Sequence, residues 1–146
     1  MRLLWRIALV LGASAGCTAP VEAPSPPGVV VEASLAAGSA LPGDDLLVDV
    51  TVRNSSRTAY SVAGSAGRCV GVVEVVDARG GRVRFGDSRV CDTGAALHPL
   101  APGAVMTDRP YVQGVPGGEY RVRAAVAIAD HGLVWSAPVP LSVHAR

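Results

Sequence analysis

Leu46 to Arg53 read LLVDVTVR, and the alternation within this stretch decides the fold class. Every second position is apolar, namely Leu46, Val48, Val50 and Val52, and the polar residues Asp49, Thr51 and Arg53 stand between them. A period of two is typical of a β-strand that buries one face and exposes the other. The stretch therefore predicts a half-buried strand.

The same alternation recurs along the chain. Tyr120 to Ile128 repeats it, with Arg121 and Arg123 on the opposite face. Further candidate strands are Val29 to Leu35, Val70 to Val76, Arg82 to Phe85, Val105 to Val112 and Leu133 to Val143. Turn signals rich in Gly, Pro and Asp separate them, and no window shows a capped helix with helical spacing. Seven or eight short strands of this kind predict an all-β chain folded as an antiparallel β-sandwich over residues 29–146.

Two prolines stand in the last candidate strand. Pro138 and Pro140 each lack a backbone N–H and so remove a donor from the sheet. This strand is therefore expected at an edge or with a bulge.

Met1 to Cys17 have the layout of a secretory signal. Arg2 and Arg6 precede a short apolar core, and small residues then lead to Cys17. Ser14 to Cys17 resembles the lipobox of bacterial lipoproteins, although Ser14 occupies a position that is usually aliphatic. The resemblance implies that residues 1–16 are removed, that Cys17 is lipidated, and that the protein is a membrane-anchored lipoprotein facing the periplasm or the cell exterior. The alternative is a soluble secreted protein cleaved near Ala15 or Ala19.

Proline is concentrated immediately after the predicted signal. Thr18 to Gly28 read TAPVEAPSPPG, and proline favours an extended, unpaired backbone. Residues 17–28 are therefore predicted to form a linker between the lipid and the domain.

The cysteines and the charge balance restrict the possible chemistry. With Cys17 lipidated, Cys69 and Cys91 remain as a pair in an oxidising compartment, which favours a disulfide over a metal site or a redox couple. A net charge of +1 excludes the strong basic excess that nucleic-acid binding usually requires. No cofactor is expected.

Four stretches, in family order, resemble the bacterial intracellular proteinase inhibitor family typified by the BsuPI domain. They are Val50 to Ser56, Val76 to Val83, Leu100 to Gly103 and Pro116 to Val122. The resemblance implies an immunoglobulin-like sandwich. No inhibitory residue of that family can be matched here, and Cys69 and Cys91 lie outside its pattern. Tyr120 follows a Gly-rich turn and is expected either to form a tyrosine corner, with its hydroxyl bonded to upstream backbone, or to pack in the core.

Other motifs for chemistry are weak. Gly86-Asp87-Ser88 lacks the context of a serine hydrolase, and no spacing selects a histidine as its base. Cys91, His98 and Met106 follow the order of blue-copper ligands but lie too far apart. Asp44 and Asp45 lack the further carboxylates of a calcium loop. We therefore predict no catalytic residue and no metal ligand.

Recognition is expected on a loop, because strands of a small sandwich serve as scaffold. Gly86 to Pro99 is the longest segment without a strand pattern, and a disulfide at Cys91 would fasten it. The candidate partner residues are Asp87, Ser88, Arg89, Asp92 and Thr93. Their replacement is expected to leave the melting temperature nearly unchanged. The alternative is a loop that only crosses between sheets.

A second candidate surface is an outward arginine stripe of Arg82, Arg84, Arg121 and Arg123, which could equally be a solvated strand face. The sequence thus predicts a non-enzymatic, lipid-anchored envelope protein with a protein-binding or structural module. The alternative is an exported proteinase inhibitor. Its expected partners are the membrane and an envelope protein, which for the inhibitor would be a protease.

Overall fold

The computed structural model describes residues 24–145, which form twelve β-strands and contain no helix. The prediction of an all-β chain is confirmed. Within this part of the chain, no helix is available that could cross a membrane. The strands are β1 Val29–Leu35, β2 Ser39–Ala40, β3 Leu46–Asn54, β4 Tyr60–Ser65, β5 Gly71–Asp77, β6 Arg82–Gly86, β7 Ala95–Leu100, β8 Val105–Asp108, β9 Tyr111–Val112, β10 Gly118–Ile128, β11 Gly132–Trp135 and β12 Val139–Val143.

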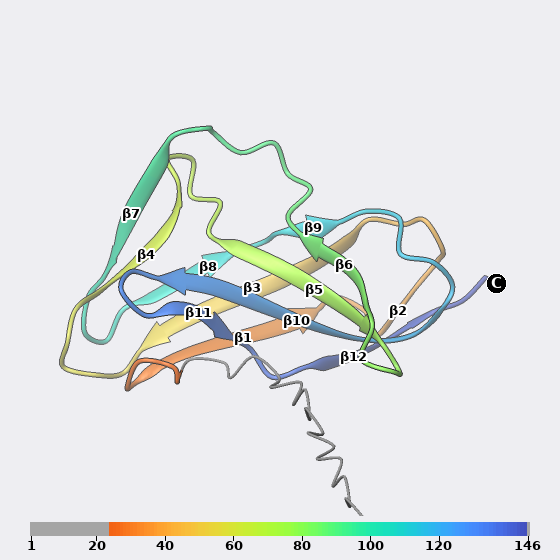
Figure 1. Ribbon diagram of the computed structural model, residues 1–146, viewed down its shortest axis with the longest axis horizontal. Helices are drawn as coiled ribbons and strands as arrows, with labels where there is room; N and C mark the ends of the chain where they lie inside the picture. The colour runs from red at the N-terminus through yellow and green to blue at the C-terminus, as the bar shows by residue number, and fades with distance from the viewer. Residues whose placement is uncertain (1–23, 146) are drawn as a thin grey trace, which may run out of the picture.

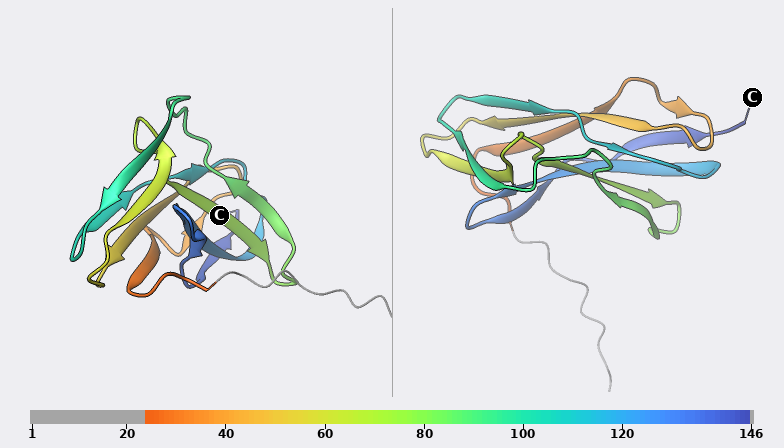
Figure 2. Two further views of the ribbon diagram at one scale, coloured as in Figure 1. Left: turned by 60° about the vertical axis from the view of Figure 1, so that its left-hand side comes forward. Right: turned by 90° about the horizontal axis from the view of Figure 1, so that it is seen from above.

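Two sheets pack against each other (Figures 1 and 2). The smaller sheet has the order β1-β3-β8, with β9 also paired to β3. The larger sheet is built around the long strand β10. One edge of β10 pairs with β12 and β11, and the opposite edge pairs with β5 and β4. All pairings are antiparallel except the short one between β12 and β2.

The core lies between the sheets and consists mostly of valine. On β3 the alternate residues Leu46, Val48, Val50 and Val52 are all buried, as their spacing predicted. They belong to the same buried cluster as Val122, Ala124 and Val126 of β10. Burying one such aliphatic side chain contributes about 1.5–3 kcal/mol. The fold is therefore stabilised by many medium-sized contacts.

Proline divides two of the predicted strands. The candidate Val105 to Val112 is split into β8 and β9, with Pro110 between them. The candidate Leu133 to Val143 is split into β11 and β12, with Pro138 between them. The count of twelve strands exceeds the expected seven or eight partly for this reason.

Pro140 shows how β12 accommodates a proline. The amides of Ser142, in β12, and of His144, just after it, donate to the carbonyls of Gly38 and Ala40, on the side away from β10. Pro140 is two residues before Ser142, so its missing N–H would also have faced that side. The proline therefore removes no hydrogen bond to β10. The expected edge position is confirmed for this part of the strand.

Asn54 ties the end of β3 to its surroundings. Its side chain is fully buried and donates to the carbonyls of Thr58 and Leu100, at 2.8 and 3.0 Å. Its Oδ1 accepts from the Ser56 amide at 3.0 Å and from the Ser56 hydroxyl at 2.7 Å. Every polar atom of this buried amide is thus used. This network gives a physical reason for the Asn-Ser-Ser sequence at the strand end.

Tyr120 combines its two expected roles. Its hydroxyl donates to the carbonyl of Gly117, three residues upstream, at 3.2 Å. Its partly buried ring packs against the core cluster.

The predicted signal, Cys17 and most of the predicted linker lie outside the described residues. The last linker residues do not match an unpaired tether. Pro26 is buried, and its carbonyl accepts from the Val29 amide at 3.1 Å. The Gly28 carbonyl accepts from the Ser55 amide at 2.8 Å. The folded domain therefore begins near Pro26 and not at Val29.

Candidate functional site

The loop between β6 and β7 is shorter than predicted. Gly86 ends β6 and Ala95 begins β7, so the strand-free segment is 87–94 and not Gly86 to Pro99. The remainder pairs with β4 in an antiparallel register. The β7 sequence AALHPL contains alanine and proline and lacks the β-branched residues typical of a strand, so its sequence did not predict one. Proline is tolerated there because β7 is an edge strand.

The predicted disulfide between Cys69 and Cys91 is confirmed. It joins the loop to the segment just before β5. Two backbone bonds add to it, because the Ser88 amide donates to Tyr111 at 2.7 Å and the Ala66 amide donates to Gly94 at 2.8 Å. The 87–94 loop spans the upper rim of the molecule in Figure 1.

A salt bridge beneath the loop provides a second anchor. The Arg89 guanidinium binds Asp108 with two hydrogen bonds, of 2.6 Å to Oδ1 and 2.8 Å to Oδ2. It also donates to Asp87 at 2.8 Å. The side chains of Arg89, Asp87 and Asp108 are only 23%, 10% and 7% exposed. A planar guanidinium is well suited to this bidentate arrangement.

Asp108 is also bonded to backbone. Its Oδ2 accepts from the amides of Val70 and Gly71, at 3.0 and 2.8 Å. Its Oδ1 accepts from the amide of Arg109 at 2.8 Å. Asp108 therefore links β8, the 87–94 loop and the start of β5. Asp108 was not among the predicted site residues, since a single aspartate at a strand end carries no recognisable pattern.

These contacts set the ionisation of the pair. Burial alone would raise the pKa of Asp108, but the bonds from Arg89, Gly71, Val70 and Arg109 outweigh it, and the pKa lies below 3.8. The hydrogen bond to Asp108 raises the pKa of Arg89 above its usual value. Both groups are charged at neutral pH.

The five candidate partner residues therefore divide into two groups. Asp87 and Arg89 point into the protein and hold the loop, so the expectation that they can be replaced without loss of stability is revised. Ser88, Asp92 and Thr93 are exposed. Val90, which was not among the predicted partner residues, is fully exposed at 102%. It stands between two fixed neighbours, Arg89 in the salt bridge and Cys91 in the disulfide.

The arginine stripe does not form as a continuous basic surface. Strand β5 lies between β6 and β10 and contributes the buried Glu74, which binds Arg82 at 2.7 Å and Arg123 at 3.1 Å. The two guanidiniums also stack on aromatic rings, Arg82 at 4.4 Å from the centre of Phe85 and Arg123 at 3.9 Å from that of Trp135.

Arg84 does not lie on the outward face with the other predicted arginines, because of a bulge. The β5–β6 register shifts between Val75 and Val76, so Arg82 pairs with Val76 whereas Arg84 pairs with the inward-facing Val75. The Arg84 guanidinium instead donates to the carbonyls of Gln113 and Gly114. Arg82 and Arg84 therefore do not share the outward face as predicted, because the bulge changes which face of the sheet the next side chains point to.

The residues considered for metal chemistry have other partners. Cys91 is bonded to Cys69, so its sulfur is not available as a thiolate ligand for copper. The ring Nε2 of His98 lies 2.8 Å from the Ser65 carbonyl oxygen. The exposed Asp44 carboxylate accepts from the Leu41 amide within its own turn.

Comparison with known proteins supports the fold alone. No family model and no curated protein matches the sequence. Among solved structures, the chain is similar to Spo0M, a sporulation control protein from Bacillus subtilis, with a TM-score of 0.55 and 11% identity over 82% of this chain. The match spans half of the Spo0M chain. A β-glucosidase from Erythrobacter marinus gives a TM-score of 0.47 and 15% identity, over 80% of this chain and 16% of that one.

Proposed function

We propose that the protein is a lipid-anchored, immunoglobulin-like module of the cell envelope that binds a partner protein through the tip of the 87–94 loop. The observation that carries the proposal is Val90, an aliphatic side chain exposed at 102% between two anchored neighbours. The lipobox resemblance of Ser14 to Cys17 supports the anchor. The β-sandwich and the BsuPI resemblance support the immunoglobulin-like module.

Fixing the loop in advance favours binding. A flexible loop loses conformational entropy when a partner orders it, at about 0.5–1.5 kcal/mol for each immobilised side chain with many rotamers. Here the disulfide at Cys91 and the Arg89–Asp108 salt bridge order the backbone before any partner arrives. Val90 itself has few rotamers to lose, because its side chain is β-branched.

The exported proteinase inhibitor remains the second candidate, and the same residue favours it. An inhibitor must present a loop that resists rearrangement in a protease cleft. The tip presents an aliphatic side chain beside a disulfide, which suits a protease whose pocket accepts small apolar residues. Inhibition assays against elastase-like and trypsin-like serine proteases test this candidate. Inhibition of the elastase-like enzymes that Val90→Arg abolishes would support it.

Replacing the exposed tip is expected to weaken partner binding without unfolding the domain. Val90→Asp should leave the melting temperature within about 2 °C of wild type, because substitutions at exposed positions usually change stability by less than 0.5 kcal/mol. Photo-crosslinking from position 90 in intact cells should capture a defined envelope protein, and affinity for that protein should fall at least tenfold in Val90→Asp. Leu97→Asp, at a 62% exposed position on β7, is the matched control. Equal binding by both variants and wild type would reject the loop as the site.

Removing the predicted lipid acceptor should release the protein from the membrane. Cys17→Ala is expected to abolish labelling by a fatty-acid analogue and to move the protein into the soluble fraction after cell lysis. Multiple acyl chains explain the size of the effect, because one chain alone gives only marginal binding. Ser14→Leu, which restores the usual lipobox residue, should keep both properties. Persistent membrane association of Cys17→Ala would exclude lipid anchoring through this residue.

A further inference from the structure

Strand β1 is the outermost strand of the smaller sheet. It pairs with β3 along its whole length of seven residues. Among residues 24–145, no strand pairs with its other edge. Edge strands of natural proteins usually carry lysine, proline or a bulge that prevents pairing with another chain. The β1 sequence VVVEASL contains none of these and has Glu32 as its only charge.

The register shows which backbone groups of β1 face outward. The Ser55 amide donates to the Gly28 carbonyl, so Gly28 and Ser55 form a hydrogen-bonded pair. Such pairs recur at every second residue of an antiparallel ladder. Val30, Glu32 and Ser34 therefore bond to β3, whereas the N–H and C=O groups of Val31 and Ala33 point toward the free edge.

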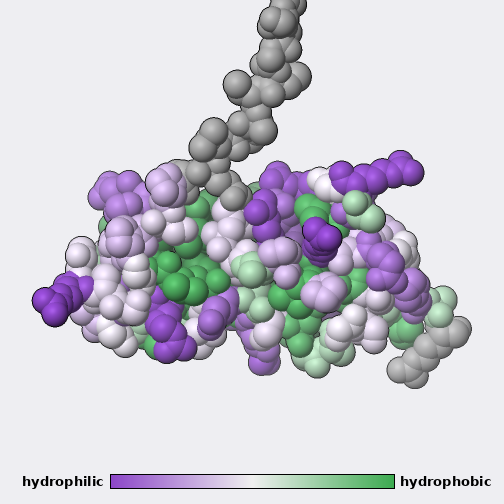
Figure 3. Space-filling view, turned by 90° about the horizontal axis from the view of Figure 1, so that it is seen from below, coloured by the Kyte–Doolittle hydropathy of each residue, from purple (hydrophilic) through white to green (hydrophobic). Residues whose placement is uncertain are grey.

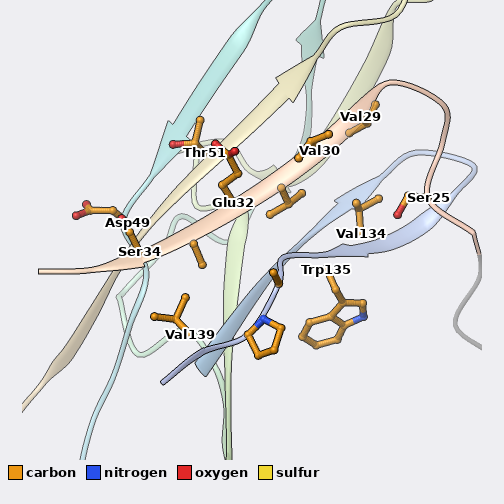
Figure 4. A pocket seen from close by; sticks show the side chains of 14 residues that line it. Ser25, Val29, Val30, Glu32, Ser34, Asp49, Thr51, Val134, Trp135 and Val139 are labelled. Carbon is orange, nitrogen blue, oxygen red and sulfur yellow. The ribbon is translucent and has the colours of Figure 1, made fainter. Parts of the chain in front are cut away.

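A groove of about 770 Å³ runs along this edge. Figure 4 shows β1 on one side of it and the segment from β11 to β12 on the other. Its apolar lining includes Val30, which is 49% exposed, together with Val134, Trp135, Pro138 and Val139. Figure 3 views the molecule from the side of β1 and β12 and shows apolar side chains gathered between hydrophilic ones. The groove thus combines unpaired backbone with apolar walls.

The charges along the groove have one sign. Glu32 and Asp49 are the only charged residues that line it. Asp49 forms an ion pair with Arg109, whereas Glu32 has no such partner within residues 24–145. The exposed Glu32 carboxylate therefore favours a cationic group in the occupant.

We propose that this groove binds an extended peptide segment of a partner protein, which adds to β1 as a further strand. The peptide would hydrogen-bond to the backbone of Val31 and Ala33 and place arginine or lysine beside Glu32. Apolar side chains at alternate positions would pack toward Val134 and Val139. Main-chain bonds supply affinity in this mode of recognition, and pockets for alternate side chains supply specificity. The site is separate from the loop around Val90.

A displayed library of random seven-residue peptides tests the proposal directly. Selection on the folded domain should enrich peptides with β-branched residues at alternate positions and arginine or lysine between them. Amide hydrogen exchange with the best selected peptide should then slow at Val31 and Ala33, while the amides of Val30 and Glu32 should change little because β3 already protects them. Failure to enrich any peptide, or protection confined to the 87–94 loop, would overturn the proposal.

Two variants separate strand addition from other kinds of contact. Ala33→Pro removes an outward N–H without removing a bond to β3, and should weaken the selected peptide about fivefold to tenfold, as expected for one lost hydrogen bond plus a steric mismatch. Ala37→Pro, beyond the end of β1, is the matched control. Glu32→Arg should reverse the preference, so that a peptide with glutamate in place of arginine binds better. Unchanged affinity in both Ala33→Pro and Glu32→Arg would reject the site.

The outcomes also separate this site from the loop and from self-association. Val90→Asp should bind the selected peptide as tightly as wild type, so failure of one site leaves the other standing. Sedimentation of the domain alone should show a monomer. A concentration-dependent dimer that protects Val31 and Ala33 and excludes the peptide would assign the edge to a second copy of this chain and overturn the proposal.

Discussion

Replacing Asp108 with alanine is expected to destabilise the domain by about 3–5 kcal/mol, the usual effect of breaking a buried ion pair by removing one partner. The Asp108 side chain is 7% exposed and binds Arg89 in bidentate fashion. Its loss leaves a guanidinium with only Asp87 as an anionic partner. It also leaves the amides of Val70 and Gly71 without their carboxylate acceptor. Urea denaturation followed by circular dichroism measures the change.

The exposed ion pair between Asp49 and Arg109 provides the control. Its side chains are 43% and 63% exposed, so Asp49→Ala should cost far less than Asp108→Ala. The triple variant Asp87→Asn/Arg89→Met/Asp108→Asn should recover part of the loss, because it removes all three charges of the cluster and leaves no buried charge without a partner. Equal effects of Asp49→Ala and Asp108→Ala would show that the buried pair does not stabilise the fold.

The same residue predicts a dependence on pH. The pKa of Asp108 is lowered in the folded state, so folding favours its ionised form. This contribution is fully present above the unfolded pKa, near 3.8, and is lost as the pH falls through the lower folded value. In Asp108→Asn the difference in stability from wild type should therefore shrink below pH 4. A difference that stays constant down to pH 2 would contradict the lowered pKa.

The alternation of residues was sufficient to predict the buried face of β3. Valine and leucine at every second position left no competing periodicity, and all four were found buried. The pairing of Cys69 with Cys91 was also predicted correctly, on the expectation that Cys17 is taken up by lipid and leaves these two cysteines as a pair. Within the last candidate strand, by contrast, Pro138 and Pro140 were interpreted as signs of an edge or a bulge and not as a division of the strand. Pro110 instead lies between the two short strands β8 and β9. No local sequence pattern distinguishes a proline that divides a strand from a proline at a sheet edge.

The candidate site was harder to predict because its contacts are distant in sequence. Arg89 and Asp108 are nineteen residues apart and meet only after the strands around them have paired. A loop rich in charged residues therefore looked like an exposed surface, although two of its charges serve to hold it. The arginine stripe failed for a related reason, since the position of Glu74 between two arginines depends on β5 lying between β6 and β10.

Removing the disulfide is expected to cost about 3 kcal/mol, because it closes a segment of 22 residues and limits the unfolded chain. Cys69→Ala/Cys91→Ala should unfold at lower urea concentration and should also weaken capture of the loop's partner, since Val90 loses one of its two fixed neighbours. The Arg89–Asp108 pair remains in this variant, so the domain should still fold at 25 °C. Backbone amide exchange in residues 87–94 should quicken relative to β10. A destabilised variant that binds the partner at full strength would show that the disulfide serves stability alone, and that the salt bridge is sufficient to order the tip.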